Sequence, residues 1–518
     1  MITSPKISRE GGFLVGGNYY FSLNVKEKIT EVCFPIFRSS TLFCFRIHDL
    51  LDEKDFKERG WIKNQINDVS LSLIVPPYRY GFYIEKPELS VGRVEAYSKI
   101  FWEIKRKVLS IKTTWLELPV YFSELGSVLP AIAFNKDKKG LYVAIGDTPD
   151  RAAVNSVHLS RVGRERLKAE TAKYLRRFQR YSQDKRMYDN TMVALFLSNG
   201  ICIDADEDCI LASKSPKYYV STAFWSRDFA FWVLPVIERF DSQRAKALIK
   251  AMLMKYWKNK GVHALYIDGR VLYEGFELDQ FSHYFSILGR ALEYGIIGEE
   301  TASKYVRELT EILERRKSKR YFLYSTDLNS SDDPVKYPYV TFDNVLLWYS
   351  IRRLAKALKD SKERERLLNL SKKIRTDIMK ELVHDGRFVY SSDLQGGYEF
   401  YDDPTGSLIL LPYFGFVRRT SQLYRRTMTW IESKENPFFI EGKFPGGANR
   451  HVRHPWLHYF ASLIMSAESK GKVIESMPLD DGLMCETIDE KTGRCLTGIH
   501  FPGASGFFVQ ARLKKDRV

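Results

Sequence analysis

The stretch NVLLWYSIRRLAKALKDSKERERLLNLSKKIRTDIMKEL, residues 344–382, contains two segments, 344–358 and 362–382, whose apolar residues recur every three or four positions. That spacing predicts two helices joined by a short loop. The same periodicity predicts further helices at 229–240, 242–257, 278–294, 299–316, 406–416, 421–431, 456–469 and 503–513. Helices in pairs should therefore dominate the chain beyond about residue 190.

Helical pairs in this number can close into a ring, with an inner set of helices surrounded by an outer set. A short repeat period, which would indicate a solenoid, is absent from the sequence. We predict an (α/α)6 toroid, the six-hairpin fold, over residues 191–518. The loops gathered at one end of such a ring suit a binding pocket.

The sequence before these predicted helices follows a different hydrophobic pattern. Short apolar or alternating runs, such as 12–15, 19–23, 70–75 and 107–111, are separated in many places by Gly, Pro, Asn or Asp. This pattern is typical of strands in a β-sandwich-like domain, which we predict at residues 1–155. A basic stretch at 159–187 has helical spacing, and we predict a helical linker over 156–190.

The net charge of +16 raises the question of a nucleic-acid partner. Basic residues are interleaved with acidic ones, as at 362–366, and the densest basic cluster, 315–320, follows a predicted helix, where cations complement the helix dipole. The sequence has neither zinc-finger spacing nor an RNP motif. We therefore expect no nucleic-acid partner.

The first residues, MITSPKISREGG, include no apolar signal stretch, and no run of 18 apolar residues occurs in the sequence. We expect a cytoplasmic protein that has no membrane partner and whose cysteines are reduced. A disulfide within either close pair, Cys202 and Cys209 or Cys485 and Cys495, remains an alternative.

Five loop-like segments combine acids, aromatic residues and glycines: 223–230, 273–280, 330–334, 401–407 and 480–489. In the first, Arg227 beside Asp228 has the chemistry to bind sugar hydroxyls, although Asp228 could instead cap a helix. In the second, a carboxyl near aromatic rings can have a raised pKa and act as a general acid, although acids also suit a helix N-terminus.

The other acidic segments are weaker signals. The neighbouring acids at 332–333 and 402–403 also suit turns, and neither pair has EF-hand spacing. Glu486, among apolar neighbours, could deprotonate water or could bond to backbone amides. The histidines at 451, 454 and 458 lack an adjacent acidic ligand, so we expect neither a metal nor another cofactor.

Taken in order, these segments resemble glycoside hydrolase family 125, the exo-α-mannosidases. The similar motifs are Trp-Ser-Arg-Asp at 225–228, Phe-Glu-Leu-Asp at 276–279, Ser-Asp-Asp at 331–333, Asp-Asp-Pro at 402–404 with Pro-Tyr-Phe-Gly at 412–415, Asn-Pro-Phe-Phe at 436–439 with Gly-Lys at 442–443, and Met-Cys-Glu at 484–486. Six matches in the same order carry more weight than any one of them.

The resemblance implies an inverting, metal-independent exo-α-mannosidase of α-1,6 type, with Asp279 as general acid and Glu486 as general base. Such a mechanism needs the two carboxyls roughly 6.5–9.5 Å apart. Glu277 is the rival for the acid. The residues expected to contact the oligosaccharide or glycan substrate are Trp225, Arg227, Asp228, Glu277, Asp332, Asp333, Asp402, Asp403, Lys443 and His451.

Several positions depart from the family. Cys485 precedes the base where the family has His, and Gln280 follows the acid where the family has Ser. The N-terminal region is more similar to family 15 glucoamylases and trehalases, in which a β-sandwich precedes the toroid. An α-glucosidase of that type, or a non-catalytic carbohydrate-binding protein, is therefore an alternative, and the oligomeric state stays open.

Overall fold

The computed structural model describes residues 7–8, 11–24, 29–37, 40–46, 72–74, 79–85, 109–112, 117–122, 131–136, 140–181 and 184–515. Its contacts divide the chain into two compact units, residues 1–222 and 223–518. The predicted domain limits at 155 and 190 stay predictions.

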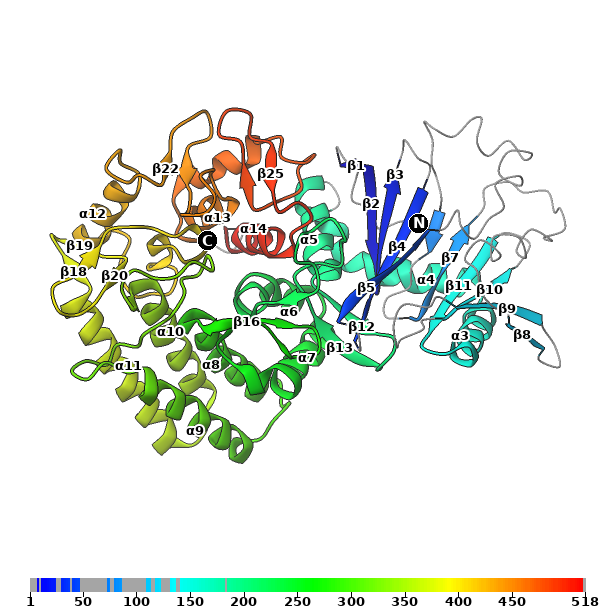
Figure 1. Ribbon diagram of the computed structural model, residues 1–518, viewed down its shortest axis with the longest axis horizontal. Helices are drawn as coiled ribbons and strands as arrows, with labels where there is room; N and C mark the ends of the chain where they lie inside the picture. The colour runs from blue at the N-terminus through cyan, green and yellow to red at the C-terminus, as the bar shows by residue number, and fades with distance from the viewer. Residues whose placement is uncertain are drawn as a thin grey trace. The chain divides into compact units, whose positions relative to one another are not determined.

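The N-terminal unit contains two antiparallel sheets (Figure 1). The first has the order β1 (Ile7–Ser8), β2 (Gly11–Gly16), β3 (Tyr19–Asn24), β4 (Ile29–Ile36) and β5 (Thr41–Arg46). The second has the order β6 (Ser72–Ile74), β7 (Gly81–Glu85), β11 (Gly140–Gly146), β10 (Ala131–Lys136), β9 (Glu117–Phe122) and β8 (Leu109–Lys112). The Phe82 ring of β7 lies 5.4 Å from Tyr19 and 5.1 Å from Phe21 of β3, so aromatic contacts connect the two sheets.

Helices follow these sheets. Thr148 caps α3 (Pro149–Val162), which packs on β10 and β11, and α4 (Arg164–Leu175), η2 (Arg176–Tyr181) and α5 (Lys185–Leu197) come next. The first of these helices thus begins ten residues before the predicted helical stretch at 159–187. A hairpin of β12 (Asn199–Cys202) and β13 (Glu207–Ile210) follows α5.

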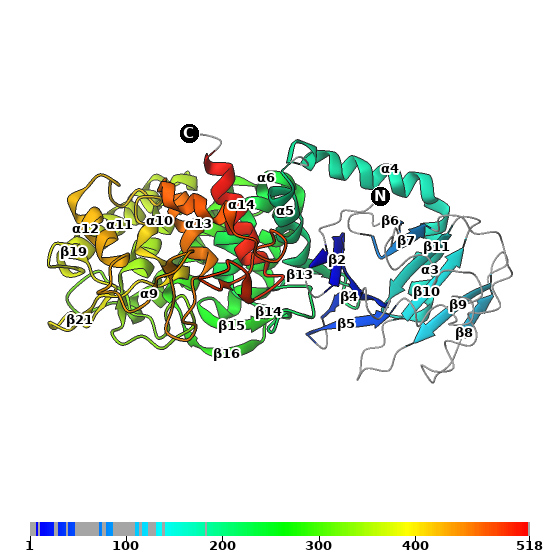
Figure 2. The same ribbon diagram turned by 90° about the horizontal axis from the view of Figure 1, so that it is seen from above.

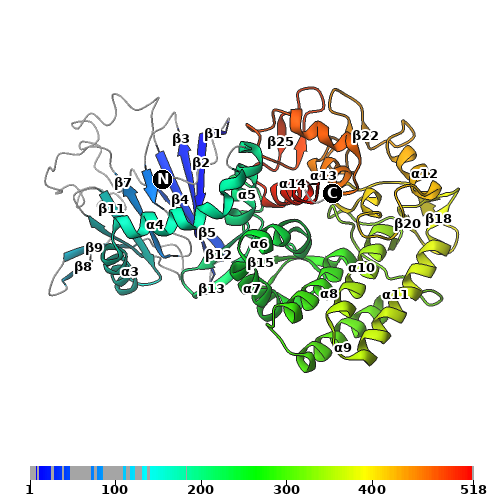
Figure 3. The same ribbon diagram turned by 180° about the vertical axis from the view of Figure 1, so that it is seen from behind.

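The C-terminal unit is a ring of helices, whose order can be followed from both sides in Figures 1 and 3. Its helices are η3 (Asp228–Val233), α6 (Leu234–Phe240), α7 (Ser242–Ala251), η4 (Met252–Tyr256), η5 (Trp257–Asn259), α8 (Leu278–Glu293), α9 (Glu299–Arg316), α10 (Thr341–Ala357), α11 (Ser361–Glu381), α12 (Gln422–Ile431), α13 (Leu457–Met465), η8 (Ser469–Ser476) and α14 (Pro502–Lys515). The predicted mainly helical class is confirmed.

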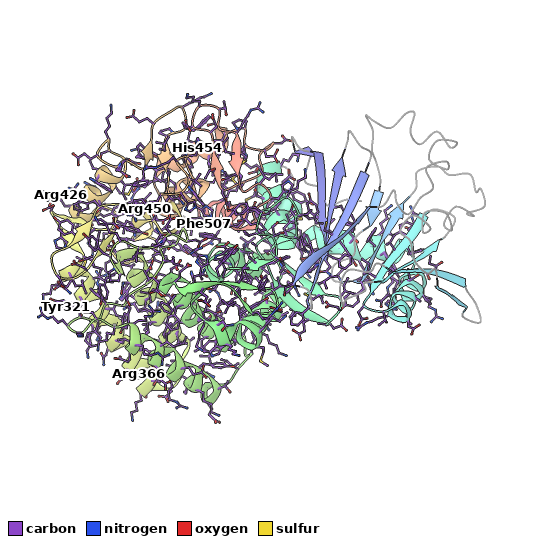
Figure 4. All side chains as sticks on the ribbon, viewed as in Figure 1. Tyr321, Arg366, Arg426, Arg450, His454 and Phe507 are labelled. Atoms are coloured by element: carbon purple, nitrogen blue, oxygen red, sulfur yellow. A yellow bond between two sulfur atoms is a disulfide. The ribbon has the colours of Figure 1, made fainter. Side chains whose placement is uncertain are left out.

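The burial pattern of each helix follows from its sequence. The buried residues of α9 recur at helical spacing on one face, at Ala302, Val306, Leu309 and Leu313, whereas α8 is buried along nearly all of its length. Helices such as α8 and α10 therefore form the inner layer and helices such as α9 and α11 the outer layer. In Figure 4, Arg366 of α11 accordingly lies at the outer edge of the ring and Phe507 of α14 toward its middle.

One predicted helix is wrong. The stretch 406–416 begins with two short 3₁₀ turns, η6 (Pro404–Gly406) and η7 (Leu408–Leu410), instead of an α-helix. The Asp402 carboxyl group accepts hydrogen bonds from Ser407 Oγ at 2.7 Å and Leu408 N–H at 2.8 Å, so a side chain takes the place of helical backbone bonds.

Short strands connect the helices at the loop ends. The three-stranded sheet β14 (Ala223–Phe224), β15 (Val262–Tyr266) and β16 (Val271–Phe276) is visible in Figure 2 and leads into α8. The others are β17 (Tyr339–Val340), β18 (Val383–His384), β19 (Arg387–Phe388), β20 (Ser391–Ser392), β21 (Tyr398–Glu399), β22 (Phe439–Ile440), β23 (Gly446–Gly447), β24 (Thr487–Ile488) and β25 (Cys495–Thr497). In the described part of the chain, every helix is too short or too polar to cross a bilayer.

Candidate active site

Arg227 is buried just before η3 and is surrounded by carboxylates. Its Nη1 donates to Glu277 Oε2 at 2.9 Å and to Asp279 Oδ2 at 3.1 Å, and its Nη2 donates to Asp332 Oδ1 at 3.0 Å. Its Nε lies 3.5 Å from Asp228 Oδ1. Burial disfavours the charged guanidinium, but these four acids outweigh it and raise the pKa of Arg227 well above its usual value.

The start of α8 brings two of these acids together. Glu277 is the extended residue before the helix, and Asp279 is in its first turn, where the helix dipole favours acids. Both are fully buried, and both reach the same guanidinium nitrogen. The structure therefore places the predicted acid and its rival in one ion-pair network.

Gln280 connects the segment that contains Arg227 to the strand that contains His263. Its Oε1 accepts hydrogen bonds from Ser226 Oγ at 2.8 Å and from the Arg227 backbone N–H at 3.0 Å. Its Nε2 donates to the His263 carbonyl at 2.7 Å. The departure from Ser at this position is therefore an integral part of how Arg227 is held.

His263, on β15, was not predicted from the sequence. Its Nδ1 forms an ion pair with Glu277, and burial raises the pKa of Glu277 to about 7 although His263 and Arg227 both oppose that increase. Ligand atoms of His263, Glu277 and Asp332 lie within 4.8 Å of one another. Arg227 donates to both of these acids, so a guanidinium already provides their counter-charge.

Glu486 lies close enough to Asp228 to act on it electrostatically. Burial raises the pKa of Asp228 to about 8 against the charge of Arg227, and the charge of Glu486 contributes to the increase. Glu486 is 5% exposed, its backbone N–H donates to Thr497 O at 3.1 Å, and its carbonyl accepts from Leu457 N–H at 2.8 Å. Asp279 thus contacts Arg227 directly, whereas Glu486 acts on Asp228 through its charge.

The loop acids are held in different ways. Asp333 lies 3.1 Å from His451 Nδ1, so these two predicted residues meet. Asp403 Oδ1 accepts hydrogen bonds from Ser331 Oγ and Thr405.

Two predicted contact residues interact with neighbours in their own loops. Both carboxyl oxygens of Asp402 accept hydrogen bonds from its own turn, as described above. Lys443 is exposed, with its Nζ 5.3 Å from the Phe444 ring centre. Within the described residues no hydrogen bond or ion pair joins Lys443 to the Arg227 network.

Aromatic side chains complete the buried surroundings. Trp225 is 6% exposed and its ring lies 6.2 Å from that of His263. His458 of α13, which was not predicted as a contact residue, is 4.3 Å from the Trp232 ring, and Trp232 also lies 5.7 Å from Arg227. Trp225 Nε1 and both ring nitrogens of His458 are buried without a hydrogen-bond partner among the described residues. Such groups normally have a partner, so they are candidates to bind water or substrate hydroxyls.

The cysteine before the proposed base is oxidised. Cys485 forms a disulfide with Cys495, which spans the hairpin of β24 and β25. The expectation of reduced cysteines is therefore wrong for this pair, because strand pairing brings the two residues to a Cα distance of 6.0 Å. Cys202 and Cys209 are buried and are not joined by a disulfide.

A model of the metal-independent α-mannosidases, glycoside hydrolase family 125, matches residues 315–512. The meiotically up-regulated gene 157 protein of Schizosaccharomyces pombe is 33% identical over 137 residues, which are 24% of this chain and 26% of that protein. The chain thus spans about a quarter of the length of this curated relative.

Two solved structures share the fold. A Streptococcus pneumoniae protein from a family of metal-independent α-mannosidases, solved in a non-productive complex with α-1,6-mannobiose, has a TM-score of 0.56 at 16% identity and covers 67% of this chain and 97% of its own. A bacterial glucoamylase in complex with acarbose has a TM-score of 0.60 at 11% identity and covers 100% of this chain and 85% of its own.

These comparisons confirm the six-hairpin toroid and the resemblance to family 125. They also bear out the expectation of a glycoside hydrolase at the level of the matching family. The glucoamylase likeness extends over the N-terminal unit. Asp279 and Arg227 precede the matched residues, and Glu486 lies within them.

Proposed function

We propose that this protein is an inverting exo-α-mannosidase that acts on an oligosaccharide or glycan of α-1,6 type. Asp279 is the general acid and Glu486 the general base. The observation that carries the proposal is the buried network in which Arg227 donates to Asp279 and Glu277 beside Asp228, the acid on which Glu486 acts. The family match over residues 315–512 supports the choice of sugar.

In the proposed reaction, Asp279 protonates the glycosidic oxygen while Glu486 removes a proton from water. The water attacks the anomeric carbon from the opposite face, so the product has inverted configuration. Arg227, Asp228 and Asp332 bind sugar hydroxyls through charge-assisted hydrogen bonds. All the acid, base and sugar-binding groups in this proposed reaction are side chains of this chain.

An α-glucoside is the second candidate substrate. The glucoamylase structure covers the whole chain, including the N-terminal unit, and Cys485 departs from the mannosidase motif. The two sugars differ in the orientation of one hydroxyl, so specificity depends on which buried polar atoms face that hydroxyl.

The test is hydrolysis of α-1,6-linked mannobiose beside 1,6-, 1,4- and 1,1-linked α-glucosides, with released sugar followed by anomer-resolved NMR. We expect release of β-mannose, and loss of turnover by a factor of about 10³ or more in both Asp279→Asn and Glu486→Gln. Release of glucose alone would assign the second candidate. Release of the α-anomer would contradict inversion.

Glu277→Gln separates the acid from its rival, because turnover should survive in this variant at a reduced rate if Asp279 is the acid. Binding of mannobiose without turnover in the wild-type protein would identify a carbohydrate-binding protein instead. A cytoplasmic location also remains our proposal, which cell fractionation tests. Disulfides are rare in the cytoplasm, so the Cys485–Cys495 bridge is the observation that argues against this location.

A further inference from the structure

Asp343 is a buried carboxyl that the proposed mechanism leaves unused. It lies in the first turn of α10 and is 0% exposed. Neither of its oxygens has a hydrogen-bond partner among the residues that the structure describes. Because an unpaired carboxylate is strongly disfavoured in such a place, the group should carry a proton.

The charged groups that act on Asp343 electrostatically are mostly acidic. Burial is the largest cause that raises the pKa of Asp343 well above its usual value, and the strongest neighbouring charge is that of Asp279, followed by Glu277 and Asp403. Arg227 opposes them only weakly, and Tyr390 is a further titratable neighbour. α8, which carries Asp279, packs directly against α10, which carries Asp343.

Asp279, in contrast, has two hydrogen-bond donors beside it. It accepts hydrogen bonds from Arg227 Nη1 at 3.1 Å and from the Gln280 backbone N–H at 2.6 Å. Both donors stabilise a negative charge, whereas a general acid must carry a proton when substrate arrives. The site therefore needs a place where that proton is kept.

We propose that Asp343 and Asp279 form a carboxyl pair that holds one proton, and that Asp343 is the positioning residue that keeps this proton available to the general acid. The inference rests on the function proposed above. Two carboxyls that share a proton titrate as a unit, so removal of one changes the pH at which the other loses its proton.

In the proposed step the proton passes from Asp343 to Asp279 and then to the substrate. When the glycosidic oxygen reaches Asp279, the O–H bond of Asp343 breaks and the proton moves to Asp279, directly or through one water. Asp279 then gives this proton to the glycosidic oxygen as the glycosidic C–O bond breaks. Glu486 releases the proton that it took from the attacking water to solvent, and an equivalent proton returns to the pair.

The first test compares the pH dependence of kcat and KM in wild-type protein, Asp343→Asn and the control Asp241→Asn. Asn has nearly the size of Asp but cannot supply the proton. We expect the alkaline limb of kcat to lie about one pH unit or more lower in Asp343→Asn. Activity near neutral pH should then be reduced about tenfold or more and recover as the pH is lowered, with KM unchanged.

The control changes another buried aspartate. Asp241 is 5% exposed and caps α7 through the Arg244 N–H at 3.0 Å, a role that Asn fills equally well, so its profile should match wild type. An unshifted alkaline limb in Asp343→Asn, with full activity or with a uniform loss at every pH, would overturn the proposal. If that variant does not fold, Asp343→Ser removes the same carboxyl and should show the same displacement.

A second measurement does not depend on catalysis. Infrared difference spectra of wild type minus Asp343→Asn, or minus Asp343→Ser, should contain the C=O band of a protonated carboxylic acid at neutral pH. Absence of this band would overturn the shared proton even in an active enzyme. A wild-type protein that shows the band but hydrolyses no glycoside would instead refute the proposed function and the catalytic role of the pair.

Discussion

The side-chain oxygen of Gln280 accepts a hydrogen bond from the backbone N–H of Arg227 at 3.0 Å. The residue after the proposed acid thus holds the arginine that pairs with that acid. The same side chain donates to His263 O, so one buried amide fixes three segments that are distant in the sequence.

Gln280→Ala should lower the free energy of unfolding by about 2–3 kcal/mol, because three buried hydrogen bonds are lost at about 1 kcal/mol each. It should also reduce kcat by about 10- to 100-fold, since Arg227 would no longer be held in position to donate to Asp279. Denaturant unfolding and steady-state kinetics measure the two effects. Gln395→Ala, which changes an exposed glutamine, should alter neither, and wild-type kinetics in Gln280→Ala would contradict the positioning role.

Gly498 leaves room for Glu486. A Cβ at this glycine would lie 2.2 Å from Glu486 Cγ, and its φ of +60° also disfavours a side chain. Gly498→Ala should displace the carboxylate and reduce kcat by about 100-fold. The matched control is Gly295→Ala, because Gly295 has a similar φ of +66° with no atom within 4 Å of such a Cβ. Equal kinetics in the two variants would argue against Glu486 as the base.

The Cys485–Cys495 disulfide closes a short loop next to Glu486. Cys495→Ser should lower the free energy of unfolding by about 2–3 kcal/mol, because the bridge restricts the unfolded chain. Calorimetry with and without dithiothreitol measures the effect. Cys33 is also disulfide-bonded, so both proteins keep a bridge that the reductant can break. Wild-type protein should therefore lose more stability on reduction than Cys495→Ser does. A reductant-independent wild-type Tm would show that the bridge is absent in solution.

Asp402 provides a pH-dependent contribution to stability. Burial raises its pKa to about 8, against the hydrogen bonds from Ser407 and the Leu408 N–H. An unfolded aspartate ionises near pH 4, so between about pH 4 and pH 8 the folded form holds a proton that the unfolded form has lost. The stability that this carboxyl contributes is therefore present at low pH and decreases as the pH rises through that window.

Asp402→Asn stays neutral at every pH and should show a smaller decrease in Tm between about pH 5 and pH 8 than wild type. Scanning calorimetry measures both curves. Asp360→Asn, which changes a cap at the surface, should follow wild type. Parallel curves for Asp402→Asn and wild type would show that this carboxyl does not retain its proton.

Much of the site could be predicted because its motifs are local in the chain. The segments 225–228 and 276–279 each contain the residue types that the Arg227 network uses. His263 and Asp343 could not be found in this way. His263 is a single polar residue in an apolar stretch, and Asp343 stands next to Asn344 at the start of a helix. The groups that act on each of them come from other elements, so no spacing in the sequence marks either residue.

The sequence by itself determined the helical periodicity, the strand-rich N-terminal region and the order of the acidic motifs, because these depend on local residue patterns. Only the tertiary structure decided which acids share the Arg227 guanidinium and that Asp402 closes its own turn. It also decided that Asp343 is buried without a hydrogen-bond partner among the described residues, on a helix that packs against the helix of Asp279. Those properties depend on distance and desolvation between segments that are far apart in the chain. The raised pKa values of this site therefore depend on the closed ring of helices, because each motif alone would be exposed to water.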